Sequence, residues 1–163
     1  MLIRDLTSME CRHVLASTNF GRLGCAKDGQ PYVVPIYFAF DGAHLYGSSM
    51  FCFSQIGQKI EWMRSNPLVC LEVDDVKSAS DWTSVVVFGH YQELPDTSEN
   101  EIARRHAHEL LTKRAMWWEP ASVAVAHPDD HHSFNPIYYR IYIDQLTGRQ
   151  GVPDTKDVLV PEG

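Results

Sequence analysis

The sequence predicts a mainly β protein, an antiparallel barrel of six or seven strands with two or three helices at its periphery. Turn dipeptides such as Asp28-Gly29 and Asp41-Gly42 separate extended segments, which is typical of hairpins. Apolar residues alternate along the longest of these segments. Strands and helices do not alternate regularly, as a doubly wound sheet would require.

The first half of the chain reads as a helix followed by a three-stranded meander. Thr7 and Glu10 fit a capping box, and the helix that they begin should fade by residues 17–19. Residues 21–47 then form three strands, and the even positions from 32 to 40 make one apolar face. Pro35 lies inside the second strand. Because proline has no N–H to donate, it predicts an edge strand or a bulge there.

Residues 45–75 are the most informative stretch, and they read as strand, polar loop, short helix and strand. Ser48, Ser49 and Ser54 lie in the expected loop, and the helix over about 55–65 carries Lys59 in its first turns. Hydroxyls, unpaired N–H groups at a helix start and one ammonium together suit a phosphate. The same residues also fit an exposed lysine beside an ordinary serine loop.

The second half of the chain adds strands and one more helix. A strand is expected over 82–94, and a second capping box at 98–101 should begin a helix that runs to about Arg114. Two further strands fit residues 122–126 and 136–143. We expect one folded domain over residues 1–148, followed by a loosely held polar tail over 149–163.

Composition excludes several classes of function. The net charge of −7 argues against nucleic-acid binding, which needs clustered Lys and Arg. No apolar run approaches the roughly 20 residues that span a membrane, and the N-terminus lacks the pattern of a signal peptide, so we expect a cytoplasmic location. The four cysteines include no CxxC pair and are expected to be small buried side chains.

The histidines offer a weaker alternative, a metal or a haem site. The densest cluster, His127 to His132, resembles a surface loop rich in Pro and Asp, so no metal site is predicted there. His106 falls on the apolar face of the helix predicted to end at about Arg114, where a half-buried structural role fits best. No histidine stands out as an axial ligand for haem.

Taken together, these segments resemble the flavin-binding split-barrel superfamily of pyridoxamine-phosphate-oxidase-like proteins, and within it the branch of the nitroimidazole-resistance proteins. The resemblance covers about residues 8–148. Its motifs occur in the family's order, and they are Gly21-Arg22-Leu23-Gly24, Pro31-Tyr32-Val33-Val34-Pro35-Ile36, Leu45-Tyr46-Gly47, Gly57-Gln58-Lys59, Asn66-Pro67-Leu68-Val69 and Arg140-Ile141.

The resemblance implies a split-barrel homodimer that holds two FMN molecules in clefts between its subunits. The cofactor-binding residues that it implies are Val33, Val34, Pro35 and Ile36 against the flavin ring, Tyr46, Gly47, Ser48 and Ser49 near the ribityl chain and phosphate, Gln58 and Lys59 at the phosphate, and Trp82, Ser84 and Trp118 facing or covering the ring.

Two departures from the family pattern stand out. Gln58 occupies the position of a cation in the family's phosphate-binding pair. This departure implies either a weaker affinity for phosphate or help from Arg64 or a residue of the partner subunit. Ser48 and Ser49 stand where some nitroimidazole-resistance proteins carry a histidine, which weakens the case for nitroimidazole reduction.

The function expected from the resemblance is that of an FMN-dependent oxidoreductase that reduces a small organic substrate with electrons from a nicotinamide nucleotide. The flavin would carry the chemistry, so no catalytic acid or base is assigned. The main alternative is a flavin- or haem-binding protein without turnover, used for storage or sensing. Oxidation of pyridoxamine phosphate is disfavoured, because cationic residues are sparse near the C-terminus, where Arg140 and Arg149 are the candidates for a second phosphate.

Overall fold

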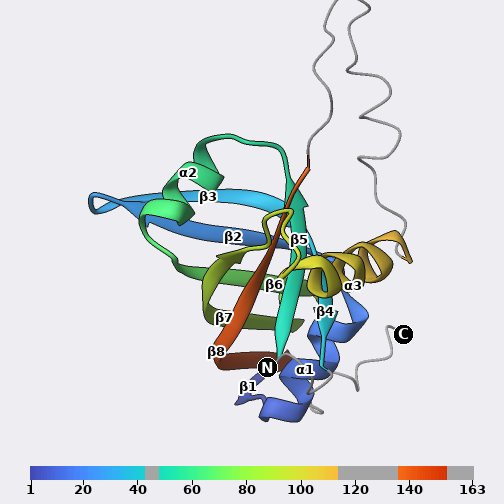
Figure 1. Ribbon diagram of the computed structural model, residues 1–163. Coiled ribbons are helices and arrows are strands. Elements are labelled where there is room, and N and C mark those ends of the chain that lie inside the picture. The colour runs from blue at the N-terminus through green and yellow to red at the C-terminus, as the bar shows by residue number, and fades with distance from the viewer. Residues whose placement is uncertain (43–47, 114–135, 154–163) are drawn as a thin grey trace, which may run out of the picture.

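The computed structural model describes residues 1–42, 48–113 and 136–153 of the chain, and within them it contains one eight-stranded sheet and three helices (Figure 1). The mainly β class predicted from the sequence is confirmed. The strands are β1 (Leu2–Asp5), β2 (Phe20–Lys27), β3 (Gln30–Tyr37), β4 (Ala39–Asp41), β5 (Ser49–Ser54), β6 (Leu68–Ser78), β7 (Asp81–Glu93) and β8 (Ile137–Val152), and the helices are α1 (Ser8–Ser17), α2 (Gln58–Ser65) and α3 (Glu101–Thr112).

The sheet is antiparallel and turns back on itself. Its strand order is β3-β2-β6-β7-β8-β5-β4, with β1 added beside β8. The two strands at the ends of this order, β3 and β4, are consecutive in the chain and are joined by the fully buried Phe38. The segment from Gln30 to Asp41 therefore pairs with β2 through its first part and with β5 through its second. Within the described residues no ladder joins β3 to β5, which is the gap of a split barrel.

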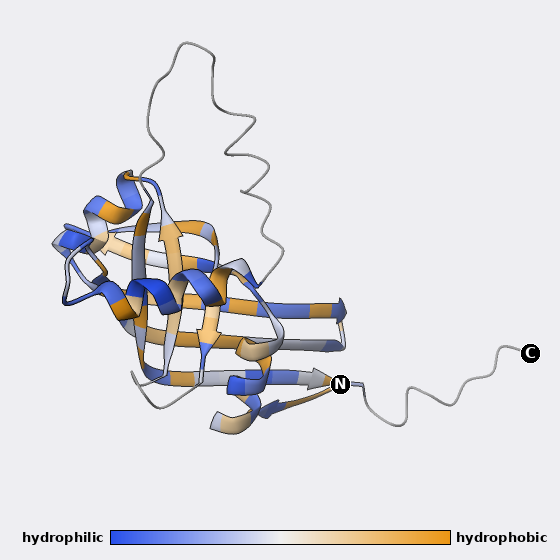
Figure 2. Cartoon of the chain, turned by 45° about the vertical axis from the view of Figure 1, so that its right-hand side comes forward, coloured by the Kyte–Doolittle hydropathy of each residue, from blue (hydrophilic) through white to orange (hydrophobic). Residues whose placement is uncertain are grey.

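The core fills the inside of this curved sheet. Its largest cluster joins fully buried side chains from most strands and from α1 and α2, and Leu15, Leu23, Phe38, Met50, Met63, Leu71 and Ile141 are among them. Figure 2 shows hydrophobic residues concentrated in the central strands. Full burial of each such side chain contributes about 1.5–3 kcal/mol. None of the described helices is long and apolar enough to cross a membrane.

Helix α1 begins as the sequence predicts. The Thr7 hydroxyl accepts a hydrogen bond from the Glu10 backbone N–H at 3.3 Å, and the Glu10 carboxylate accepts one from the Thr7 backbone N–H at 2.8 Å. This reciprocal pair is the predicted capping box, and it satisfies two N–H groups that the helix itself leaves unpaired. The helix ends at Ser17 and buries Cys11 and Leu15 against the barrel.

Helix α3 begins differently from the prediction. Its N-cap is Asn100, which makes no side-chain capping bond, so the capping box expected at residues 98–101 does not form. The Asn100 amide instead donates to the Thr97 hydroxyl at 2.9 Å. The helix packs Ala103 and Ala107 against Phe51 on the outer face of the sheet. The strand expected over 122–126 lies outside the described residues.

Strand β5 occupies a stretch for which the sequence predicts a polar loop. The prediction is wrong because both faces of β5 are covered. Met50 and Cys52 face the barrel core, whereas Phe51 lies under α3. A strand that is buried on both faces lacks the alternation of polar and apolar residues by which a half-exposed strand is recognised. In addition, the apolar run of β5 is short and has a serine at each end, which is typical of a polar loop.

The C-terminal strand is longer than the sequence indicates. β8 continues to Val152, past the expected end of the folded domain at residue 148. The added residues are held because β7 and β1 both pair with them. Residues beyond 153 are not among those that the structure describes.

Replacing Phe38 by alanine tests the closure of the sheet. We expect Phe38→Ala to lower the free energy of unfolding by about 3–5 kcal/mol, because it leaves a cavity where β3 continues into β4. Val76→Ala is the control, since Val76 is exposed and should change stability by no more than about 0.5 kcal/mol. Urea denaturation measures both, and equal effects of the two changes would contradict this view of the closure.

Candidate functional site

The residues expected against a flavin ring lie on an edge strand. β3 pairs only with β2 among the described strands, in a register that shows no bulge and places Pro35 opposite Arg22. Of the two alternatives that Pro35 left open, the edge strand is therefore confirmed. Ile36 is buried in the core with Val34 packed against it, whereas Val33 is 64% exposed. One row of backbone groups along β3 thus has no ladder partner in the described sheet.

Helix α2 lies beside this strand, with its start open. Figure 1 shows α2 over the side of the barrel formed by β2 and β3, and Trp62 on α2 packs against Tyr32 with ring centroids 5.4 Å apart. Gly57 is the N-cap and offers no side-chain capping bond. A Cβ built on Gly57 would meet no described atom within 4 Å, so there is space at the helix start. Uncapped N–H groups with space in front of them suit an anion.

Lys59 lies in the first turn of α2 and is partly buried. Burial lowers the pKa of its ammonium, and the thiols of Cys52 on β5 and Cys25 on β2 lie near enough to raise it slightly in return. Lys59 makes no hydrogen bond or ion pair with any residue that the structure describes. A partly desolvated cation without a counter-charge is unfavourable, so this ammonium is suited to a ligand anion.

The neighbouring thiols do not supply that counter-charge. Burial raises the pKa of Cys52 to about 12 and also raises that of Cys25, so both are neutral near pH 7. Tyr139, fully buried next to Cys52, also has its pKa raised by burial, and its hydroxyl makes no hydrogen bond of regular geometry with a described residue. The expectation that Cys11, Cys25 and Cys52 are small buried side chains is confirmed, whereas Cys70 is partly exposed.

The serines expected in one phosphate loop are separated by β5. Ser49 and Ser54 are the two ends of this strand, which places them about 16 Å apart. Ser48 accepts a hydrogen bond from Arg12, and Ser49 is fully buried. Only Ser54 remains close in sequence to the start of α2. Ser49 and Ser54 of one chain therefore lie too far apart to contact the same phosphate group.

Arg64 does not serve as the second cation. Its guanidinium forms two hydrogen bonds of 2.7 Å with the Glu93 carboxylate, and the Tyr91 hydroxyl donates to the same carboxylate at 2.8 Å. Gln58, at the first position of α2, is exposed and uncharged. Among the residues predicted to bind the phosphate, Lys59 is therefore the one described side chain that brings a positive charge to the start of α2.

Trp82 and Ser84 lie on β7, which is separated from β3 by β2 and β6. Three steps across the sheet amount to about 14 Å. The Ser84 hydroxyl donates to Glu72 at 3.2 Å, and Trp82 packs so closely over Gly151 that a Cβ there would lie 2.5 Å from the indole nitrogen. Within one chain these two residues therefore do not face β3.

The sequence prediction missed an ion-pair array beside Ser84. Arg22 on β2 contacts Glu72 at 3.0 Å and Asp74 at 2.5 Å, both on β6. Glu72 and Asp74 are two residues apart along β6, and this spacing places their side chains on the same face of the sheet. Only the pairing register of β2 with β6 shows that Arg22 lies opposite them.

Several predicted residues lie outside the described part of the chain. They are Tyr46, Gly47, Trp118 and the cluster His127 to His132. Within the described residues, no group of three or more His, Cys, Asp or Glu side chains is placed to hold a metal ion. His106 has the half-buried structural role that was predicted, with its Nε2 2.8 Å from the Asp41 carboxylate and its ring edge-to-face with Phe51.

Comparison with known proteins identifies the family. Residues 7–150 match the family model described as pyridoxamine 5′-phosphate oxidase. The chain belongs to this family. An uncharacterized protein of Rhizobium meliloti (strain 1021), RA0666, is 42% identical over 149 residues, which are 91% of this chain and 95% of the relative.

Solved structures agree with this assignment to the pyridoxamine 5′-phosphate oxidase family. A protein of Mesorhizobium loti described as FAD-binding is 41% identical, with a TM-score of 0.74 over 94% of this chain and 99% of its own. A proposed 5-nitroimidazole antibiotic resistance protein of Bacteroides thetaiotaomicron is 18% identical, with a TM-score of 0.62 over 92% of this chain and 89% of its own. At that identity the second likeness concerns the fold alone. The resemblance inferred from the ordered motifs is confirmed.

The pairing of Glu93 with Arg64 predicts how stability depends on pH. The hydrogen bonds from Arg64 lower the pKa of Glu93 below its value in the unfolded chain. The stabilisation is therefore complete above the unfolded pKa of about 4.5 and is lost as the pH falls through the folded value. We expect the unfolding free energy of Glu93→Gln to decline less steeply than that of the wild type between about pH 5 and pH 3. If urea titrations show that the unfolding free energies of the variant and the wild type decline in parallel over this pH range, the Arg64–Glu93 pair does not contribute to stability.

Proposed function

We propose that this protein binds FMN, with the flavin phosphate on Lys59 at the start of α2 and the flavin ring along the edge of β3. The observation that carries the proposal is the partly buried Lys59 ammonium, which has no anionic partner among the described residues. A bound phosphate would return the electrostatic stabilisation that burial removes.

The start of α2 fits a terminal phosphate in charge and in space. The unpaired N–H groups of the first turn carry a partial positive charge, and the open space at Gly57 gives access to them. One ammonium and one helix start are a modest amount of positive charge. They suit a single phosphate group whose affinity is supplemented by contacts to the ring.

The edge of β3 fits a flat heterocycle with hydrogen-bonding groups on its rim. Backbone N–H and C=O groups along this edge have no ladder partner in the described sheet. Val33 projects outward and offers an apolar surface to a ring. The relative from Mesorhizobium loti that is described as FAD-binding supports a flavin as the ligand. FMN, which ends in the phosphate that Lys59 requires, is our specific proposal.

We further propose a homodimer with the flavin between its subunits. Trp82 and Ser84 lie about 14 Å across the sheet from β3, so a flavin against β3 meets them only from a second copy of the chain. The ion-pair array of Arg22, Glu72 and Asp74 lies on β2 and β6, between β3 and β7, and would border such a contact. A cytoplasmic location remains a prediction from the sequence.

We propose that the flavoprotein is an oxidoreductase that passes electrons from a nicotinamide nucleotide to a small organic substrate. When bound, the flavin supplies the hydride and electron transfer. The residues of this chain bind and orient it. Lys59 holds the phosphate, the β3 edge fixes the plane of the ring, and the exposed side of Val33 excludes water from one face.

The absorbance spectrum of the purified protein distinguishes the competing functions. We expect yellow flavin bands, and mass spectrometry of the released cofactor should identify FMN. A Soret band would indicate haem instead. Reduced nicotinamide nucleotide should bleach the flavin bands under anaerobic conditions if the protein is an enzyme. A flavin that stays oxidised would indicate a carrier or sensor and contradict the oxidoreductase proposal.

Exchange of Lys59 for methionine tests the phosphate assignment. Lys59→Met should weaken FMN binding by tenfold or more, because it removes a charge-assisted contact. Binding of riboflavin, which lacks the phosphate, should change little. The melting temperature of the flavin-free variant should equal or exceed that of the wild type, since a partly buried charge is removed. Fluorescence quenching of the flavin measures both affinities.

The matched control is Lys77→Met, which removes an exposed lysine of the β6–β7 hairpin and should leave both affinities unchanged. Full FMN affinity in the Lys59→Met variant would refute the assignment.

A further inference from the structure

A second candidate site lies away from α2. An open pocket of about 370 Å³ is formed by the segment from β1 through α1 together with β7 and the end of β8. Its apolar wall consists of Leu6, Met9 and Val14. In Figures 1 and 2, α1 lies at the other end of the barrel from α2. The pocket is therefore separate from the phosphate site proposed at Lys59.

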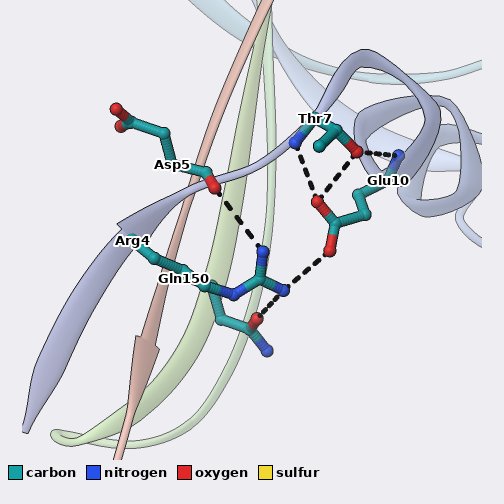
Figure 3. Close-up of polar contacts among 5 residues, drawn as sticks. All are labelled: Arg4, Asp5, Thr7, Glu10 and Gln150. Carbon is teal, nitrogen blue, oxygen red and sulfur yellow. Dashed lines mark hydrogen bonds and ion pairs between the residues drawn. The ribbon is translucent and has the colours of Figure 1, made fainter.

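The polar rim of the pocket is a fixed network (Figure 3). The Arg4 guanidinium donates to Glu10 and to Gln150, both at 2.8 Å. The second oxygen of the Glu10 carboxylate accepts hydrogen bonds from the backbone N–H and the hydroxyl of Thr7, at 2.8 and 2.9 Å. The pKa of Glu10 is lowered to about 2, chiefly by the hydrogen bond from Arg4 and to a smaller extent by those from Thr7. Glu10 is therefore charged and fully engaged at any physiological pH.

The rim retains hydrogen-bonding groups that this network does not use. The Nε–H of Arg4 makes no hydrogen bond with a described residue, and neither does the imidazole of His13 nor the hydroxyl of Thr83, both of which line the pocket. Glu10, the acidic residue of the lining, has both oxygens directed to Arg4 and Thr7. The unused groups of the rim are thus the N–H of a cation, an imidazole and a hydroxyl, and they favour a ligand with acceptor atoms or a single negative charge.

We propose that this pocket binds a small aromatic monoanion of the aryl carboxylate type. The ring would lie against Leu6, Met9 and Val14, where the polarisable thioether of Met9 suits an aromatic face. The carboxylate would accept hydrogen bonds from Arg4 and His13. The volume lies at the lower end of the range for small-molecule sites, which fits a compact ligand. The proposal is independent of the flavin site.

Calorimetry with 2-naphthoate as the probe tests the site on the full chain, both flavin-free and flavin-loaded. We expect one molecule to bind per chain in both states. Val14→Trp fills the pocket and should lower the affinity at least tenfold. Val76→Trp is the matched control, because it adds the same side chain at an exposed position on the β6 tip and should change nothing. If Val14→Trp melts early, Thr83→Leu fills the pocket from the opposite wall.

The charge of the probe tests the role of Arg4. Arg4→Gln should weaken 2-naphthoate about tenfold and leave the neutral 2-naphthalenemethanol unchanged. The cation 2-naphthylmethylammonium should bind more weakly than either probe to the wild type. The proposal is overturned if 2-naphthoate does not bind, or if it binds equally well to Val14→Trp. It is also overturned if Val14→Trp alters the number of subunits, since the pocket would then be a contact between chains.

Discussion

The path of one segment determines the rest of the structure. Residues 30–41 pair with β2 through their first part and with β5 through their second, and the buried Phe38 joins the two parts. This continuity turns the sheet into a barrel but leaves β3 and β5 unpaired with each other. Two features result from that path. One edge of β3 has no ladder partner among the described strands, and α2, which follows β5, packs on β2. The site that we propose at Lys59 is thus a consequence of the incomplete closure of the barrel.

Electrostatics then distinguish this position from an ordinary surface. The thiols nearest to Lys59 are neutral, and Arg64 is committed to Glu93. The ammonium is thus left partly buried without a counter-charge among the described residues, which costs free energy that a bound anion would offset. The family assignment and the Mesorhizobium loti relative described as FAD-binding support a flavin as the ligand that we propose there.

Local signals in the sequence were sufficient for some of these features. Pro35 predicted an edge strand or a bulge, and β3 is an edge strand among the described strands. Thr7 with Glu10 predicted the start of α1, because a capping box depends on residues close in the chain. Strand β5 could not be recognised, since its burial depends on α3, about fifty residues later in the sequence. The Arg64–Glu93 pair and the separation of Ser49 from Ser54 likewise follow from tertiary pairing that no local pattern encodes.

The protonation of Lys59 tests the central claim most directly. Nitrogen NMR of the labelled side chain can follow its pKa in the flavin-free protein and after the addition of FMN or riboflavin. We expect the Lys59 pKa to lie below the usual lysine value without ligand, to rise when FMN binds, and to show no comparable rise with riboflavin. A Lys59 pKa that FMN leaves unchanged would contradict the proposal that the flavin phosphate binds at Lys59.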